Sequence, residues 1–300
     1  MAYFTHLSYW ISIAMSPVAA GLLTRLFIFQ HDCGHGSFWK GKKANGWTGR
    51  GLSLLTFTPY SFWRRAHNIH HAASGNLNLR GDGQIDTITL TEYSTLPRWK
   101  KCLYKIYRNP VFLILFGTPF YTILGQRWPL NGGINFHPEY KSLPTRSIWK
   151  SVMLTNLSLA AFYGAIAYVF GFVTLVLIYL PILIITAWIG GWLFYIQHQF
   201  EETYWASKEH WNIKDAALAG SSYYALPRIL QWFTGNIGIH HIHHLSSKIP
   251  NYKLQECLEA MPSLGKVNRL TLRQSMSCIN LKVWDDESYR LVPLPKTASG

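Results

Sequence analysis

The sequence predicts an all-α integral membrane protein, in which transmembrane helical hairpins support a histidine-rich metal site on the cytoplasmic side. Two observations lead to this prediction. The 300 residues are 49% apolar and only 14% charged, which is too apolar for an ordinary soluble chain of this length. In addition, most of the histidines are concentrated in three short clusters.

The first predicted span covers residues 7–30. Its only charged side chain is Arg25, which is long enough to reach the membrane interface. The segment lacks the basic start and the small-residue cleavage site of a removable signal peptide. We therefore expect it to remain in the protein as a membrane-spanning helix.

A helical hairpin is predicted over residues 151–198. Residues 151–197 contain no charged side chain. At about 1.5 Å per residue they form about 70 Å of helix, enough to cross a core of about 30 Å twice. We expect one span at 151–170, a turn at Gly171 and a second span at 172–198.

Two shorter apolar runs, 51–62 and 111–125, fall below the length of a spanning helix and are interrupted by Pro59 and Pro119. We expect them to form interfacial or re-entrant helices.

Every Lys and Arg except Arg25 lies outside the predicted spans, so the positive-inside rule assigns residues 31–150 and 199–300 to the cytoplasm. The whole chain is predicted to form one membrane domain.

The three histidine clusters have the spacing of metal ligands. They read His31-Asp-Cys-Gly-His35, His67-Asn-Ile-His70-His71 and His240-His-Ile-His243-His244. On a helix, residues i, i+3 and i+4 share one face, so each cluster can direct its imidazoles at one point. Excluding His241, which would point away, eight imidazoles exceed the coordination sphere of one ion, and two metals are implied.

Other candidate ligands are weaker. Cys33 points off the face of His31 and His35, and the four cysteines lack CxxC spacing. We assign no role to the isolated His6, His137 and His210. Five carboxylates near the clusters could either accept the second N–H of an imidazole or be solvated loop charges: Asp32, Asp86, Glu201, Glu202 and Asp215.

An all-imidazole site without thiolates suits iron that reacts with dioxygen, because zinc would supply only Lewis acidity.

No glycine-rich phosphate loop is present, so nucleotide binding has no support. Nucleic-acid binding would need a folded basic module, and none is visible. Most of the net charge of +14 follows from positive-inside topology.

The boxes HDCGH, HNIHH and HHIHH, together with QHQFEETYW at 197–205 and PNYKL at 250–254, resemble the membrane fatty acid desaturases. The nearest resemblance is to bacterial acyl-lipid desaturases of the delta-12 (omega-6) or delta-5 type, and it extends from about Ala19 to about Asp286. The resemblance implies a bacterial cytoplasmic membrane protein with two iron ions. Such an enzyme uses dioxygen and two external electrons to leave a cis double bond and water.

The resemblance also implies the ligand set and the partners. The family's ligands correspond to His31, His35, His67, His70, His71, His240, His243 and His244, and His198 matches a histidine at the end of the last span. The expected substrate is a membrane phospholipid acyl chain, and the expected electron donor is a ferredoxin or a small cytochrome attracted to the basic face. Basic residues near membrane-edge aromatics could hold headgroups: Lys40, Lys42, Lys43, Arg64 and Arg65.

Two alternatives remain open at this point. A hydroxylase or carotenoid oxygenase would share the metal site, whereas a metal-binding membrane transporter should have charged residues within its spans, which 151–197 lacks. Relatives also have a further apolar segment before the first box, so we expect an N-terminal span to be missing from this chain.

Overall fold

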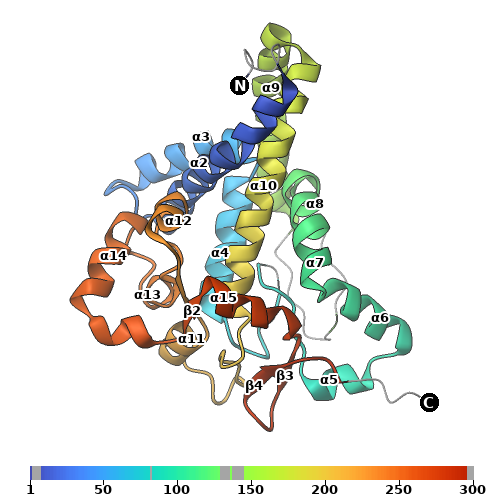
Figure 1. Ribbon diagram of the computed structural model, residues 1–300, viewed down its shortest axis with the longest axis vertical. Helices are drawn as coiled ribbons and strands as arrows, with labels where there is room; N and C mark the ends of the chain where they lie inside the picture. The colour runs from blue at the N-terminus through green and yellow to red at the C-terminus, as the bar shows by residue number, and fades with distance from the viewer. Residues whose placement is uncertain (2–7, 82, 129–135, 137–144, 296–300) are drawn as a thin grey trace.

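The computed structural model describes residues 1, 8–81, 83–128, 136 and 145–295. Three of its helices are long and apolar enough to cross a membrane, with candidate spans at Tyr9–His35, Ile148–Phe170 and Phe172–His198. In Figure 1 the last two project together from one end of the molecule, while most of the short helices and strands gather toward the other end. The all-α prediction for the membrane fold is confirmed.

The first long helix, α2 (Tyr9–His35), ends where the sequence supplies a glycine. Gly36 adopts the left-handed conformation, with φ at 67°, and its N–H bonds the carbonyls of Asp32 and Cys33. A residue with a Cβ would be strained at this φ, so the glycine allows the helix to stop directly after His35. This stop places the first histidine box in the last turn of α2.

The hairpin consists of α9 (Thr145–Phe170) and α10 (Phe172–His198), separated by Gly171 at φ 86°, where the sequence predicts the turn. Helix α10 packs against α2 through Ala20, Leu23, Ile182 and Leu183. The hairpin tip leaves apolar side chains exposed, Tyr168 at 93% and Phe172 at 69%. Exposed apolar surface of this kind is what contact with lipid requires.

Two shorter helices continue from the first box: α3 (Lys42–Thr56) and α4 (Tyr60–Ala73). Pro59, at which the sequence predicts an interruption, directly precedes α4, and Phe57 closes α3 with a positive φ of 57°. At Gly49 a Cβ would lie 2.3 Å from the Tyr60 ring. The glycine therefore allows α3 and the start of α4 to pack closely.

The predicted segment 111–125 is helical, but its proline does not break it. Pro119 lies in the first turn of α8, where the missing N–H costs least. A π-helical turn precedes it. The elements of this region are α5 (Leu90–Thr95), α6 (Arg98–Tyr107), α7 (Pro110–Phe112), η1 (Leu113–Gly117), α8 (Thr118–Ile123) and η2 (Gly125–Arg127).

The part of the chain after α10 forms short elements that cover the base of the long helices. Its helices are α11 (Ile213–Ala219), α12 (Arg228–Phe233), α13 (His240–Leu245), α14 (Asn251–Ala260), η3 (Pro262–Lys266), α15 (Leu272–Ser275) and η4 (Met276–Asn280). Strand β1 (Tyr223–Ala225) pairs in parallel with β2 (Arg269–Thr271), and β3 (Val283–Asp285) pairs antiparallel with β4 (Arg290–Val292).

Candidate metal centre

The first histidine box is held in place by the carboxylate between its two imidazoles in the sequence. Asp32 is 1% exposed, and its Oδ1 lies 3.1 Å from Nδ1 of His31. Its Oδ2 accepts hydrogen bonds from the backbone N–H and the side-chain amide of Asn251, at 2.6 and 2.7 Å. A proton on Nδ1 of His31 therefore has an acceptor, which leaves Nε2 free to bind a metal.

The second box lies on α4, where His67, His70 and His71 occupy one face of the helix as the spacing predicts. Trp63, one turn earlier, stacks on His67 with ring centroids 4.7 Å apart and an interplanar angle of 17°. A Cβ on Gly34 would lie 2.9 Å from the Trp63 ring. The ends of α2 and α4 thus pack closely enough to bring the first two boxes together.

The third box forms the short helix α13. The preceding run 235–238 contains two left-handed residues, Gly235 at φ 54° and Asn236 at φ 58°. His241 points away from the other histidines, as predicted, and its Nε2 lies 3.0 Å from the carbonyl oxygen of Leu264. Burial lowers the pKa of His241 to about 4, so it packs as a neutral side chain.

His198 is the last residue of α10 and is buried. Its Nδ1 lies 3.0 Å from the carbonyl oxygen of Gly220, which fixes the tautomer with Nε2 unprotonated. That Nε2 is 3.0 Å from Nε2 of His70 and 3.1 Å from Nε2 of His240. The end of the last span therefore contributes an imidazole to the same place as the second and third boxes.

The structure brings all nine predicted histidines into two adjoining groups. The first group has five members, with ligand atoms within 4.8 Å of one another: His31, His35, His67, His71 and His243. The second has four members at the same spacing: His70, His198, His240 and His244. The groups meet where the rings of His71 and His244 stack, with centroids 4.0 Å apart.

Both groups fit transition-metal ions. Two nitrogens bound to one ion at about 2.1 Å each are about 3 Å apart when their bonds are perpendicular. Within the groups, His71 lies 3.1 Å from both His67 and His243, measured between Nε2 atoms. Among the described residues, buried Nε2 atoms of His31, His35 and His244 have no hydrogen-bond partner. A buried nitrogen without a hydrogen-bond partner lowers the stability of the fold by about 1–3 kcal/mol unless a ligand binds it.

The electrostatics of the site favour binding of a metal ion over protonation of the imidazoles. Burial, reinforced by the neighbouring imidazoles, lowers the pKa of six histidines well below their ordinary value of 6.5: His67, His70, His71, His240, His243 and His244. A neutral imidazole is the form that binds a metal. The described groups contain no thiolate and no carboxylate, a donor set suited to iron, copper or zinc.

Among the five candidate carboxylates, Asp32 lies against an imidazole of the site. Glu201 pairs with Arg290, at 2.9 Å, on the surface. Glu202 and Asp215 are exposed. The backbone N–H of Asp86 donates to the Tyr107 hydroxyl at 2.9 Å.

The remaining predicted residues occupy other positions. Cys33 belongs to neither group, and its carbonyl accepts a hydrogen bond from the Tyr60 hydroxyl at 2.7 Å. Nδ1 of the exposed His210 lies 3.1 Å from the Ser207 hydroxyl. His6 and His137 lie outside the described residues.

Sequence reasoning missed three positioning groups: Asn251, the Gly220 carbonyl and Trp63. Asn251 lies inside the PNYKL run, so the resemblance marks its segment without indicating its contact with Asp32. Trp63 precedes His67 by one helical turn, and this spacing is a signal that sequence analysis can use. The Gly220 carbonyl has no side-chain signal and emerges only from the fold.

Comparison with known proteins gives consistent matches. The family model described as fatty acid desaturase matches residues 8–274. A fatty acid desaturase of Bacillus subtilis is 40% identical over 285 residues, which cover 95% of this chain and 78% of that protein. An sn-1 acyl-lipid omega-3 desaturase (ferredoxin) of Synechocystis is 31% identical over 83% of this chain and 67% of its own length.

An endoplasmic reticulum omega-3 fatty acid desaturase of Vigna radiata is 29% identical over 84% of this chain and 65% of its own length. These matches extend across the histidine clusters and the long apolar helices, so they concern the whole arrangement rather than one motif. The resemblance to the fatty acid desaturase family drawn from the boxes is confirmed, and the transporter alternative is wrong. This chain belongs to the fatty acid desaturase family, whose members are oxidoreductases of the membrane.

Proposed function

We propose that the protein is an acyl-lipid desaturase that uses a diiron centre and dioxygen to introduce a cis double bond into a phospholipid acyl chain. The observation that supports this most strongly is the pair of adjoining imidazole groups, assembled at the ends of apolar helices. In this proposal the first group holds one iron and the second group holds the other. The iron supplies the redox chemistry by which dioxygen and two external electrons remove two hydrogens.

The residues of the chain would orient the metal ligands and exclude water, and they would not react themselves. Asp32 and the Gly220 carbonyl would hold protons at Nδ1 of His31 and His198, which directs both Nε2 atoms toward metal. Buried imidazoles and the packed Trp63 would keep bulk water away from the centre. No protein side chain is required as a base.

We propose that the histidine boxes face the cytoplasm of a bacterial cell. The distribution of Lys and Arg supports this orientation. A small acidic redox protein, such as a ferredoxin, would then reach the basic cytoplasmic face and supply electrons. The names of several relatives include ferredoxin, which favours this donor over a small cytochrome.

We propose delta-12 (omega-6) as the position of the new double bond, on the resemblance of the boxes and their flanking runs. Omega-3 desaturation is the second candidate, because the Synechocystis and Vigna radiata relatives are named as omega-3 desaturases. Hydroxylation and carotenoid oxygenation could use the same ligand set. Only the product distinguishes these reactions.

The test is expression in a bacterial host whose lipids contain only saturated and monounsaturated chains, followed by mass spectrometry of fatty-acid methyl esters. We expect a diene that is lighter by two hydrogens than its precursor, with the new bond at delta-12. A culture supplied with a delta-9,12 diene tests the omega-3 candidate. A product that gains oxygen would contradict desaturation, and the His70→Ala variant is the inactive control.

A further inference from the structure

The short helix α12 exposes most of its apolar side chains. Ile229 is 71% exposed, Trp232 51% and Leu230 40%. In Figure 1 this helix lies beside α2, and a Cβ on Gly21 of α2 would lie 2.7 Å from the Phe233 ring. A helix of six residues that packs through one ring and exposes three large apolar side chains needs apolar surroundings on its outer side.

The chain from α12 onward follows one face of α2, and the contact at Gly21 is the first of three. Nη1 of Arg25 donates a hydrogen bond to the carbonyl oxygen of Trp232. A Cβ on Gly235 would lie 2.9 Å from Cγ2 of Ile28. Gly21, Arg25 and Ile28 have the spacing i, i+4 and i+7, so they share one side of the helix. The segment therefore runs along α2 toward the first histidine box.

The contacts of α12 lie within the membrane part of α2, which is one of the candidate spans. Trp10, near the start of α2, is exposed in the manner of an aromatic residue at the far interface. A hydrocarbon core of about 30 Å takes about 20 helical residues, which places the near boundary at about Gln30. Arg25 and Gly21 are then about 8 and 14 Å inside this boundary.

The surroundings of α12 are apolar on both elements. Val18 and Leu22 of α2 are exposed within the candidate span. Residues 229–247 contain no Lys, Arg, Asp or Glu, so α12 can enter a membrane without burying a charge of its own. Arg228, directly before this run, is exposed and long enough to reach the headgroups.

Arg25 is a charged residue within a span, and α12 supplies contacts for it. Its guanidinium lies 4.3 Å from the centre of the Trp232 ring and 5.4 Å from that of Phe29. A cation in the hydrocarbon region is unfavourable unless polar groups or aromatic faces contact it. Because Trp232 offers both a carbonyl and a ring, the charge and the short helix stabilise each other at this depth.

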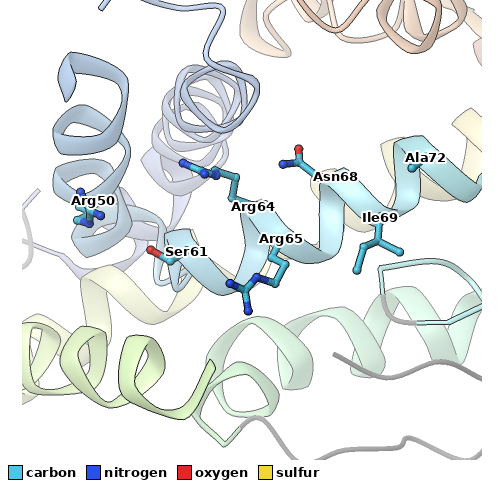
Figure 2. A pocket seen from close by; sticks show the side chains of 7 residues that line it. All are labelled: Arg50, Ser61, Arg64, Arg65, Asn68, Ile69 and Ala72. Atoms are coloured by element: carbon cyan, nitrogen blue, oxygen red, sulfur yellow. The ribbon is translucent and has the colours of Figure 1, made fainter. Parts of the chain in front are cut away.

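An exposed isoleucine alone does not indicate lipid. Ile69 of α4 is also exposed, but it lines a hollow together with Arg50, Arg64 and Arg65. Figure 2 shows the two arginines of α4 extending from the helix, with Arg50 on the neighbouring α3. Charged side chains of this kind prefer water or headgroups, whereas α12 has no charged residue after Arg228.

We propose that α12 is inserted in the membrane leaflet nearest the histidine groups, with Ile229, Leu230 and Trp232 against lipid acyl chains, and that Arg25 anchors it there. The surface of α12 is continuous with the exposed apolar surface of a span, so its partner is lipid and not a soluble protein. Residues 199–300 therefore do not lie wholly in the cytoplasm. This insertion does not depend on the reaction that the metal centre performs.

Insertion of α12 fixes the third histidine box relative to the first. The segment that leaves α12 passes Asn236, whose Nδ2 donates to the Asn251 carbonyl at 3.2 Å. The side-chain amide of Asn251 in turn donates to Asp32, beside His31. The third box begins at His240, four residues after Asn236. Contact between α12 and the membrane thus determines where the chain approaches the metal centre.

The test reads the surroundings of α12 with an environment-sensitive fluorophore, nitrobenzoxadiazole, in liposomes of phosphatidylethanolamine and phosphatidylglycerol. The full chain carries it at I229C, with the accessible native cysteines replaced as C102S/C257S. The matched control is I213C, an exposed isoleucine of α11. We expect emission at shorter wavelength and at least about twofold stronger quenching by acyl-chain nitroxides at 229 than at 213, and the reverse with aqueous iodide.

The two quenchers separate the possible occupants. Quenching at 229 by iodide as strong as that at 213 would place α12 in water and overturn the proposal. Protection of 229 from both quenchers would show that protein, such as a second copy of the chain, covers the helix, which would also overturn it.

Variants of α2 test the anchor. R25M keeps the length of the side chain without its charge, and we expect it to move the 229 probe toward water and to lower the metal content, while R25K restores most of both. G21L displaces the Phe233 ring independently of charge and should act like R25M. G164L is the control, because a Cβ at this position of α9 meets no atom within 4 Å. An unchanged 229 probe in R25M and G21L would refute the anchor.

The measurements on α12 need no turnover, so they are repeated on the H70A protein, which lacks a ligand of the second group. Lipid contact at 229 in a protein that forms no diene even with His70 intact would remove the proposed function and keep the insertion. Diene formation by a protein whose 229 probe is in water would do the opposite. The two failures are therefore distinguishable.

Discussion

Asp32 and Asn251 are 219 residues apart in the sequence, yet Oδ2 of Asp32 accepts two hydrogen bonds from Asn251, at 2.6 and 2.7 Å. The other carboxylate oxygen faces Nδ1 of His31. This contact joins the first histidine box to the helix that follows the third box. It orients an imidazole through a residue that touches no metal.

Replacing Asn251 with Ala should therefore weaken metal binding without removing a ligand. Oδ2 of the buried Asp32 would keep only the hydrogen bond from the backbone N–H, at a cost of about 1–3 kcal/mol. We expect lower iron content and a lower thermal midpoint. The control is Gln255→Ala on the same helix, which loses one exposed hydrogen bond to Glu259. Equal iron content in the two variants would contradict the positioning role.

Removal of a ligand from either group should abolish product formation. His243→Ala takes one imidazole from the first group, and His70→Ala takes one from the second. Both proteins should still insert in the membrane, because the spans are unchanged. His210→Ala should stay active, since the imidazole of this exposed histidine lies against the Ser207 hydroxyl and belongs to neither histidine group. Near-normal turnover in either ligand variant would refute the dimetal centre, as fatty-acid analysis of whole cells can show.

His198 can be tested separately from the boxes. His198→Ala should lower both iron content and activity, and His198→Gln should restore neither, because an amide binds iron weakly. The measurements are iron by mass spectrometry and product by chromatography. Full iron occupancy with unchanged activity would show that His198 is only a packing residue at the end of α10.

Metal content is the fourth test. Protein produced in iron-replete cells should contain about two irons per chain, because the structure offers two imidazole groups. Zinc is expected to replace iron when overexpression exceeds the iron supply. A strong chelator should remove both metals and the activity together, and ferrous iron should restore them. One iron or none in freshly prepared protein would contradict the assignment of two sites.

The packing of α3 on α4 gives a matched pair of stability predictions. Gly49→Ala places a Cβ 2.3 Å from the Tyr60 ring and should destabilise the protein by about 1–3 kcal/mol. Gly51→Ala, two residues later, meets no atom within 4 Å and should be neutral or stabilise by up to about 1 kcal/mol through helix propensity. Thermal unfolding in detergent compares them, and equal midpoints would be inconsistent with this packing.

Features set by local spacing could be predicted from the sequence. The positions of His67, His70 and His71 on one face follow from the helical period, and the turn at Gly171 follows from the lengths of the two apolar runs. The outward direction of His241 follows from the same period. In each case the information lies within a few residues of the feature.

Features set by tertiary contact could not be predicted. Five carboxylates near the boxes were equivalent in the sequence, and the contacts of Asp32 with His31 and Asn251 distinguish it from the others. The division of nine imidazoles into groups of five and four separates His70 from its neighbour His71. Sequence adjacency would have placed them together, but they lie about 100° apart around α4 and face different groups.

The distribution of the ligands along the chain has a consequence for biosynthesis. The first group takes imidazoles from α2, α4 and α13, and the second takes them from α4, α10 and α13. The first group is complete only when residue 243 has left the ribosome and the second only when residue 244 has, after all three candidate spans have been made. Loading of the two proposed metal ions would therefore follow synthesis of the spans, and a nascent chain arrested before α13 would expose imidazoles that any available zinc or copper could capture.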